Sequence, residues 1–414
     1  MKISIITLGC KVNQCESNSI AKDLTELGHT VSQKLEPADL YILNSCAVTG
    51  IAEKKSRTHL AKFKKLNSKA KVIVCGCASQ HNADQFLCHE NVSVVLGIAG
   101  KSKVSQVVNL VGNLTQPLST QYEYYTHTNT SKTRAYIKIQ DGCNNFCSYC
   151  LIPYLRGRSR SRELDDILSE VKLVEQTNKE IVLTGINISD YKINGELALD
   201  KLMQSLANST CRIRIGSLEV NVITPKLLEI LKQMSNFCPQ FHLSMQSGCN
   251  RILKLMNRHY TKEQYLEKIQ LIRQYFPNAS ITTDVIVGFP TETEEDFAET
   301  VDTIKKANFF EMHIFPYSKR DGTVASKLKL CDGNVVNQRV KILEEINQHN
   351  KINYIQNQNN LCVLTENFEG EYVVGHTENF IKIYLPKDTP RHELINITNI
   401  MPFKDGATAD IISR

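Results

Sequence analysis

The chain has 414 residues and a formal net charge of +6 at pH 7. Hydrophobic residues make up 42% of it and charged residues 22%, a balance that excludes a disordered or fibrous chain. The length predicts about two or three domains, and the modest positive charge is compatible with a polyanionic partner without requiring one.

The cysteine content is high, with 14 cysteines in the chain. In a secreted protein these would be interpreted as disulfides. However, the apolar run within residues 1–10 is shorter than the ~7–15 residues of a signal core. There is also no run of ~18 consecutive apolar residues that could span a membrane. We therefore expect a cytoplasmic protein whose clustered cysteines bind metal or carry out redox chemistry.

Apolar, β-branched runs alternate with amphipathic stretches in the first part of the chain. Strands are expected at residues 2–7, 39–44, 71–74 and 92–96, and helices at residues 16–27 and 50–66. This order predicts an α/β domain over residues 1–115, with a parallel sheet covered by helices. A polar stretch at residues 112–134 is interpreted as an interdomain linker.

A second α/β series follows and predicts a central domain over residues 130–355. Strands are expected at 135–140, 180–183, 212–215, 241–245, 280–287 and 311–315, with helices at 164–175, 226–234 and 294–307. About six such units indicate a partial or complete (β/α) barrel. After a long polar helix at 335–358, short strand-like segments at 362–367, 372–376, 380–384, 395–401 and 409–412 predict a small β-barrel domain over 356–414.

The sharpest signal is a group of three cysteines, Cys143, Cys147 and Cys150, spaced C-x3-C-x2-C just after the first strand of the second series. Thiolates on one short loop can converge on one soft metal centre. Three ligands on a four-iron cluster leave one iron open to a substrate or cofactor. A zinc site is the alternative, but no fourth Cys or His lies close in sequence.

A second group of cysteines emerges from the predicted strands. Cys10, Cys46 and Cys77 each come just after one of the first three long strands. Because the carboxyl ends of parallel strands share one edge of the sheet, these cysteines are expected to meet there and to form a second cluster site. Cys75 is a rival ligand to Cys77, since residues two apart on a strand face the same side.

Several motifs together resemble the methylthiotransferase family of radical S-adenosylmethionine (SAM) enzymes over essentially the whole chain. They are residues 7–14 (TLGCKVNQ), 44–49 (NSCAVT), 76–80 (GCASQ), 140–143 (QDGC) continuing to Pro153, 156–162 (RGRSRSR), 242–248 (HLSMQSG), 284–290 (DVIVGFP) and 317–323 (YSKRDGT). One departure is Thr291, which stands where the family usually has glycine.

The resemblance implies an N-terminal methylthiotransferase domain, a radical SAM barrel and a C-terminal TRAM domain. It assigns Cys10, Cys46 and Cys77 to an auxiliary [4Fe–4S] cluster, and Cys143, Cys147 and Cys150 to the cluster that cleaves SAM. The implied reaction inserts a methylthio group at an unactivated C–H bond of adenine, which protein acids and bases cannot cleave. An electron donor protein and a sulfur donor are implied as partners.

Further residues are predicted to bind SAM and RNA. Tyr149 precedes the last loop cysteine, while Gly185 and Asn187 follow a strand end where the amino acid part of SAM could bind. Arg156, Arg158 and Arg160 beside the loop are expected to contact tRNA phosphates, together with the TRAM-like barrel.

The opening motif favours one substrate within the family. Lys11-Val12-Asn13-Gln14 resembles the branch that acts on N6-threonylcarbamoyladenosine, 3′-adjacent to the anticodon in tRNA. Arg158 or Arg320 could pair with the carboxylate of that base. The alternatives are the same reaction on isopentenyladenosine in tRNA or on a ribosomal-protein aspartate, and a non-catalytic zinc-dependent RNA-binding module.

Overall fold

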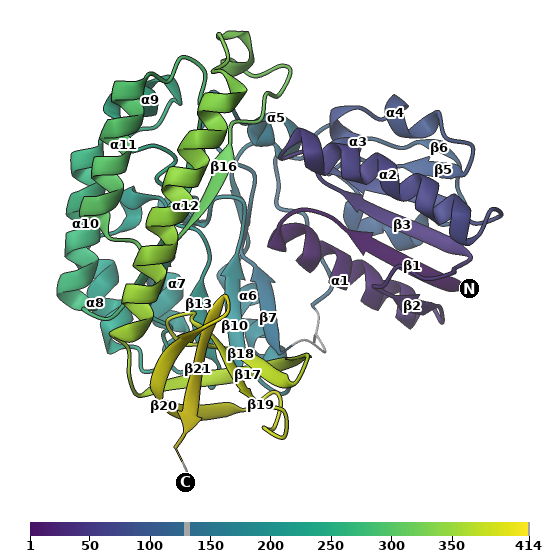
Figure 1. The fold of residues 1–414 in the computed structure, drawn as a ribbon. Coiled ribbons are helices and arrows are strands. Elements are labelled where there is room, and N and C mark those ends of the chain that lie inside the picture. The colour runs from purple at the N-terminus through teal and green to yellow at the C-terminus, as the bar shows by residue number, and fades with distance from the viewer. Residues whose placement is uncertain (128–132, 413–414) are drawn as a thin grey trace.

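The computed structural model describes residues 1–127 and 133–412, which form three packed parts (Figure 1). The first part is a parallel six-stranded sheet of order β2-β1-β3-β4-β5-β6. Its strands are β1 (Lys2–Thr7), β2 (Thr30–Ser32), β3 (Leu40–Ser45), β4 (Lys71–Gly76), β5 (Val92–Val95) and β6 (Gly112–Asn113).

Helices cover both faces of this sheet. One face packs against α1 (Lys11–Glu26) and the 3-10 helix η1 (Lys101–Gln106). The other packs against α2 (Gly50–Leu66), α3 (Cys77–His81) and α4 (Asp84–Leu87). All six residues of β3 are buried, as expected of a central parallel strand.

Helix α1 begins five residues earlier than the sequence pattern indicated. It begins at Lys11, directly after Cys10, and its first turns bury polar side chains, among them Asn13, Glu16 and Ser17. A helix with a buried polar face lacks the amphipathic periodicity on which the prediction depended. The opening motif is therefore helical, and it lies between the sheet and the central domain.

The central part is a barrel open on one side. Its parallel strands are β7 (Arg134–Lys138), β10 (Glu180–Thr184), β13 (Arg212–Ile215), β14 (Gln240–His242), β15 (Ser280–Val287) and β16 (Glu311–Pro316). Isolated bridges between Ile213 and Phe237 and between Leu218 and Leu243 join its two three-stranded sheets. Among the described residues no ladder joins β7 to β16, so the partial barrel is the alternative that the structure supports.

Helices surround this barrel on its outer side (Figure 1). They are α6 (Leu164–Val174), α7 (Leu199–Ser205), α8 (Pro225–Gln233), α9 (Asn250–Leu255), α10 (Lys262–Tyr275), α11 (Glu294–Ala307) and the long α12 (Gly333–Gln356). The α/β fold class is confirmed. No helix in the described part of the chain is long and apolar enough to cross a membrane.

The predicted linker is a packed connection. Its first residues form β6 at the edge of the sheet. Farther along, the Ser19 hydroxyl and the Lys22 ammonium donate hydrogen bonds to the carbonyls of Thr126 and His127, at 2.8 and 2.9 Å. The connection thus runs against α1, while residues 128–132 lie outside the described part.

The C-terminal part is a closed barrel of order β17-β18-β19-β21-β20. Its strands are β17 (Leu361–Glu369), β18 (Tyr372–Thr377), β19 (Lys382–Pro386), β20 (Leu394–Phe403) and β21 (Gly406–Ile411). It docks at the amino ends of the central strands, where Arg212 and Arg214 donate hydrogen bonds to backbone carbonyls of Cys362 and Thr377, at 2.8 and 3.0 Å. The opposite, carboxyl ends remain free for the site.

Candidate active site

The loop of Cys143, Cys147 and Cys150 lies at the carboxyl end of the barrel strands. Donors surround its sulfur atoms: the backbone N–H of Asn145 lies 3.5 Å from Cys143 Sγ, and that of Ile152 lies 3.4 Å from Cys150 Sγ. The Arg258 guanidinium donates to Cys147 Sγ at 3.4 Å. Donors aimed at sulfur stabilise thiolates and tune clusters that thiolates hold.

Burial keeps the free thiols of this loop neutral. Burial raises the pKa of Cys143 to about 11 and that of Cys150 to about 12, so both free thiols are protonated at neutral pH. A bound metal centre supplies the positive charge that deprotonates such thiols. The donor set and its N–H···S contacts fit the cluster that the sequence predicts.

Glycine is required immediately before this loop. Gly142 has a φ of +72°, and a Cβ atom there would lie 2.1 Å from the carbonyl oxygen of Arg158. Only glycine tolerates both the left-handed backbone and the close approach. Gly142 thereby allows the loop of Cys143 to pack closely against the segment that carries Arg156, Arg158 and Arg160.

The structure brings Cys10, Cys46 and Cys77 together at the carboxyl edge of three neighbouring strands. Cys10 precedes α1, Cys46 follows β3, and Cys77 begins α3 after β4. Burial, together with smaller contributions from Cys77 and Cys10, raises the pKa of Cys46 to about 11, which places all three within electrostatic range. Their role as ligands of a second cluster remains a prediction.

The rival ligand, Cys75, has different surroundings. Its side chain is fully buried in the apolar layer on the α1 side of the sheet, with Ile5, Ile42 and Ile73. Cys77, in contrast, has left the strand and belongs to the layer on the α2 side. The assumption that both residues continue one strand was wrong, because β4 ends at Gly76.

The spacing of the cysteines argues against a preformed zinc site. Tetrahedral zinc with bonds of ~2.3 Å holds its sulfurs roughly 3.8 Å apart. In the part of the chain that the structure describes, no trio of cysteine sulfurs lies within 4.8 Å of one another. A metal centre larger than a single zinc ion is the better match to both cysteine triads.

Two of the predicted phosphate contacts are wrong. Arg156 is fully buried and Arg160 is 8% exposed. Arg156 donates to Asp141 at 2.9 Å and to Glu16 at 3.0 Å, and Arg160 donates to the carbonyl of Arg156 at 2.8 Å. A run of arginines in sequence does not reveal the buried acids that neutralise it. Only Arg158 is exposed, with its guanidinium 4.4 Å from the centre of the Phe146 ring.

Arg156 and Arg160 belong to a buried charge network between the two triads. Lys101, Lys138 and Arg156 all pair with Glu16. Burial raises the pKa of Glu16, but these three cations lower it more, so the carboxyl stays ionised. Arg160 adds a fourth cation, 3.7 Å from Asp141.

The network therefore has four cations and two carboxylates, and its excess positive charge lies beside the triad of Cys10, Cys46 and Cys77. Arg156 lowers the pKa of Cys77, partly offsetting the increase caused by burial. The Nε atom of Arg156 is buried without a hydrogen-bond partner in the described chain. Such surroundings fit an anionic thiolate cluster at Cys10, Cys46 and Cys77.

The predicted SAM contacts lie around the loop. The Asn187 amide is 3.9 Å from Cys143 Sγ, and its backbone N–H donates to the side-chain oxygen of Gln140 at 2.7 Å. Tyr149 packs edge-on against Phe289, with 6.4 Å between ring centres. A Cβ at Gly185 would lie 3.0 Å from the carbonyl of Gln140. Binding of SAM by Tyr149, Gly185 and Asn187 remains a prediction.

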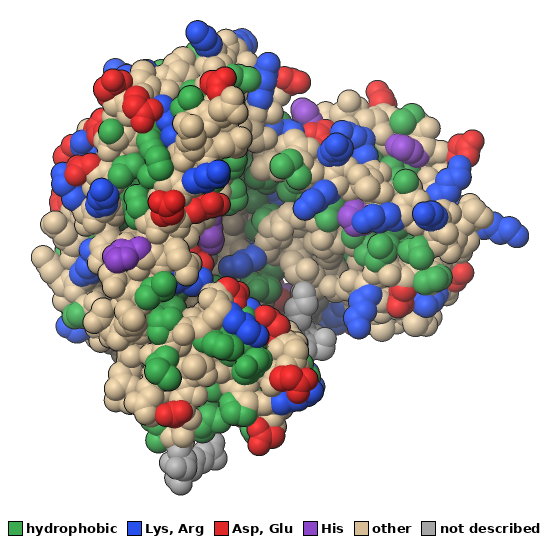
Figure 2. All heavy atoms as spheres, viewed as in Figure 1, with side chains coloured by type: hydrophobic (Ala, Val, Ile, Leu, Met, Phe, Trp, Pro, Cys, Tyr) green, Lys and Arg blue, Asp and Glu red, His purple; other side chains and the backbone are tan. Residues whose placement is uncertain are grey.

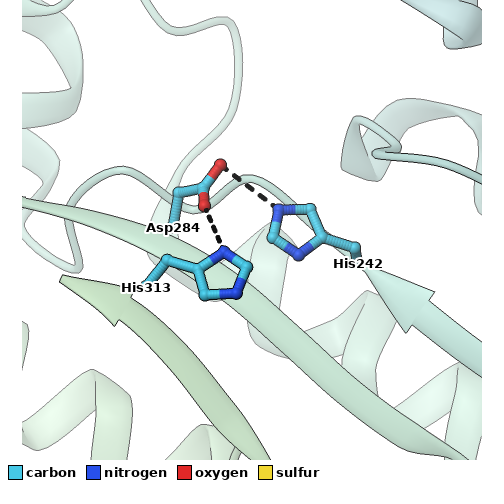
Figure 3. A group of neighbouring side chains, drawn as sticks. All are labelled: His242, Asp284 and His313. Atoms are coloured by element: carbon cyan, nitrogen blue, oxygen red, sulfur yellow. Dashed lines mark hydrogen bonds and ion pairs between the residues drawn. The ribbon is translucent and has the colours of Figure 1, made fainter. Parts of the chain in front are cut away.

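The sequence analysis missed a polar trio on three barrel strands (Figure 3). Asp284 accepts hydrogen bonds from His242 at 3.2 Å and from His313 at 3.1 Å. Burial raises the pKa of Asp284, but the two imidazoles lower it more, and Asp284 in turn raises the pKa of His313. His242 and Asp284 are the first residues of two motifs quoted above, 242–248 and 284–290. That position was the signal in the sequence that could have identified them.

The surface is hollowed between the central and N-terminal parts, and basic and histidine side chains are visible inside the hollow (Figure 2). The open side of the barrel faces α1 there, because α1 packs against β7.

Comparison with known proteins defines the class. Residues 137–304 match the Radical SAM superfamily, and residues 2–97 match "Uncharacterized protein family UPF0004". The chain is similar to the solved structure of the radical S-adenosylmethionine methyltransferase TsrM from Kitasatospora setae, with a TM-score of 0.57 and 11% identity. That alignment covers 76% of this chain and 72% of TsrM. The fold is that of a radical SAM enzyme.

Curated relatives narrow the class. The chain is 37% identical to "Threonylcarbamoyladenosine tRNA methylthiotransferase MtaB" of Aquifex aeolicus, over 84% of this chain and 88% of that protein. It is 35% identical to "tRNA-2-methylthio-N(6)-dimethylallyladenosine synthase" of Desulforamulus reducens, over 83% and 79% of the two chains. The chain therefore belongs to the methylthiotransferase family of radical SAM enzymes, as its motifs indicated. Membership implies SAM and a [4Fe–4S] cluster as cofactors.

Proposed function

We propose that this enzyme converts N6-threonylcarbamoyladenosine, 3′-adjacent to the anticodon of tRNA, to its 2-methylthio derivative. One observation carries the proposal: Arg156 joins the two cysteine triads, because it follows the Cys150 loop by six residues and hydrogen-bonds to the helix that begins after Cys10. Two cysteine triads joined in this way suit a reaction that needs both C–H activation and sulfur delivery.

When bound, a [4Fe–4S] cluster on Cys143, Cys147 and Cys150 supplies the electron that cleaves SAM, while a second cluster supplies sulfur. The residues of the chain position and protect these groups. Arg258 and the loop N–H groups hold the sulfurs of the first triad. Arg156 and its partners fix the second triad relative to the first. Helix α1 covers the open barrel side against water.

Binding of tRNA is assigned to exposed cation–aromatic pairs of the C-terminal barrel. The Arg391 guanidinium lies 4.7 Å from the centre of the Phe368 ring, and the Lys404 ammonium lies 5.2 Å from that of Phe403. Phe368 is 52% exposed. Aromatic faces combined with cations are the usual means of binding unpaired nucleotides.

The choice of base rests on the opening motif and on relatives that carry the threonylcarbamoyl name. Relatives named for the dimethylallyl base have similar identities and make it the second candidate. Mass analysis of tRNA nucleosides from a deletion strain separates the two. We expect the methylthio-threonylcarbamoyl nucleoside to vanish and its precursor to accumulate. Loss of the methylthio-dimethylallyl nucleoside instead would overturn the choice.

A further inference from the structure

Lys11 presents an unpaired cation to the cleft. It is the first residue of α1 and follows Cys10 directly. Its side chain is exposed, and the ammonium lies 5.8 Å from the centre of the Tyr136 ring, in the middle of β7. Within the described residues, its ammonium has neither an ion pair nor a hydrogen bond. Its charge is therefore available to a ligand.

The surroundings of Lys11 are electropositive. Arg134 and Arg214 lie within electrostatic range, and Glu180 is the nearby acid. That acid is already shared by Arg212 and Arg214, at 2.6 and 3.0 Å. Arg134 in turn pairs with Glu366 at 2.6 Å, so neither acid is free to pair with Lys11.

Two other cations near the site, Arg258 and Arg320, are already neutralised. Arg258 pairs with Glu219 at 3.1 Å. Arg320, which the sequence suggested as a carboxylate partner, pairs with Glu53 at 2.6 Å and is buried, so that suggestion was wrong. In the described part of the chain Arg158 also lacks an ion pair, but its guanidinium lies over the Phe146 ring, 4.4 Å from the ring centre, whereas the Lys11 ammonium lies beside β7.

The position of Lys11 selects among anions. Next to Tyr136 it lies at mid-strand, away from the loop at the strand ends where SAM is expected. It also lies where α1 meets β7, between the N-terminal and central parts. Carbon 2, the atom that reacts, and the N6 substituent belong to the same purine. A carboxylate on N6 therefore lies to one side of carbon 2. Lys11 directly follows Cys10, a predicted ligand of the second cluster, so its side chain is placed to meet a carboxylate beside the reacting carbon.

We infer that Lys11 recognises the carboxylate on the N6 substituent of the substrate adenosine and thereby selects threonylcarbamoyladenosine over neutral N6 groups. This inference rests on the proposed function. A dimethylallyl group would leave the ammonium without an anion, and a site built for a charged partner rejects analogues that lack it. The acid at Asp284 does not oppose the carboxylate, because His242 and His313 both bond to it.

The test compares two RNAs with three proteins. One anticodon stem-loop carries the threonylcarbamoyl group, and the other carries the methyl amide of its carboxyl group. Wild type, Lys11→Met and Lys69→Met are reconstituted without oxygen and matched for iron. Lys69 is an exposed lysine just before the amino end of β4, far from the cysteine edge, and is the control.

We expect wild type and Lys69→Met to prefer the acid over the amide by roughly tenfold or more in kcat/KM. Lys11→Met should treat the two RNAs equally, and Lys11→Arg should recover part of the preference. Iron content and visible spectra equal to wild type show that the variants are loaded and folded.

Three outcomes would overturn the inference. The first is an undiminished acid preference in Lys11→Met. The second is an equal loss on both RNAs together with a shallower salt dependence of binding, which identifies a phosphate contact. The third is a raised KM for SAM with no change in RNA preference. If instead wild type acts on dimethylallyl RNA and ignores threonylcarbamoyl RNA, the proposed function itself has failed.

Discussion

The guanidinium of Arg156 donates a hydrogen bond to Oε1 of Glu16 at 3.0 Å, although 140 positions separate the two residues in sequence. Both side chains are fully buried. Arg156 belongs to α5 (Ile152–Arg156), just after the Cys150 loop, and Glu16 lies in α1 after Cys10. This ion pair joins the N-terminal part to the central part, and so fixes the position of one cysteine triad relative to the other.

Replacing Arg156 should therefore destabilise the junction. Arg156→Met removes the buried guanidinium that hydrogen-bonds to both Glu16 and Asp141, at a cost of about 3–5 kcal/mol in the free energy of unfolding. Urea unfolding followed by circular dichroism measures it. Arg158→Met, two positions away and exposed, should cost less than ~1 kcal/mol. Equal effects of the two changes would contradict the structural role of Arg156.

Iron content tests the two triads. We expect anaerobically reconstituted protein to hold two [4Fe–4S] clusters, about eight irons per chain, because each triad offers three thiol ligands and a cluster needs thiolates of this kind. Replacing Cys143, Cys147 and Cys150 together by alanine should halve the iron and abolish SAM cleavage. Zinc in either triad of protein purified without oxygen would refute the assignment.

Cys75 and Cys77 form a matched pair for the auxiliary site. Cys77→Ala should remove the methylthio product while leaving some SAM cleavage, because it removes a predicted ligand of the second cluster. Cys75→Ala should retain product, since its thiol lies in an apolar layer away from the sheet edge. The reverse pattern would assign Cys75 as the ligand.

The sequence predicted elements and cysteine groups well because these depend on local patterns. Strands β1, β13 and β15 match their expected bounds. It failed where long-range partners decide a role. Arg156 looked like a phosphate contact because its acids, Glu16 and Asp141, lie in other elements. The trio of His242, Asp284 and His313 forms only when three strands align.

Thr291 illustrates a local conflict between residue and backbone. The sequence departs from glycine there, and the residue adopts a φ of +67°, which strains a β-branched side chain. Thr291→Gly should raise the free energy of unfolding by roughly 1 kcal/mol after the extra flexibility of unfolded glycine is deducted. Asn308→Gly, at a φ of +48°, should change stability less, because asparagine tolerates this region. Thermal unfolding of both variants measures these two changes in stability.

The docking of the C-terminal barrel should weaken in acid. Burial raises the pKa of Glu180, but Arg214 and Arg212 lower it more, to about 2. A depressed carboxyl pKa contributes stability above the ordinary value near 4.5 and loses it as the pH falls toward 2. The full contribution is about 3 kcal/mol.

Glu180→Gln should thus be less stable than wild type at pH 7, and the difference should shrink by about 1 kcal/mol by pH 4. Urea midpoints at the two pH values measure it in samples matched for iron. Glu371→Gln removes an 82% exposed carboxylate of the same barrel and should show no such dependence. A constant difference between wild type and Glu180→Gln would exclude this carboxyl as the source.

Contacts with RNA are best tested by point variants of the C-terminal barrel. Deleting the barrel would also remove the backbone carbonyls that Arg212 and Arg214 bind, so a loss of affinity could reflect damage to the central domain. Arg391→Gln and Lys404→Gln each remove an exposed cation stacked on an aromatic ring. Phe368→Ala removes an exposed ring that can stack on a base.

We expect each of the two cation changes to reduce the slope of log affinity for tRNA against log salt by roughly one unit, because each phosphate contact releases about one counterion. Phe368→Ala should instead lower affinity by about 1–3 kcal/mol at every salt concentration, since stacking does not release counterions. Lys382→Gln is the control, because Lys382 already pairs with Glu369 at 2.8 Å and Asp405 at 3.0 Å. Arg158→Gln, measured in the same way, reports whether the exposed arginine beside the Cys150 loop also meets a phosphate. Unchanged slopes for Arg391, Lys404 and Arg158 together would place the RNA on another face of the enzyme.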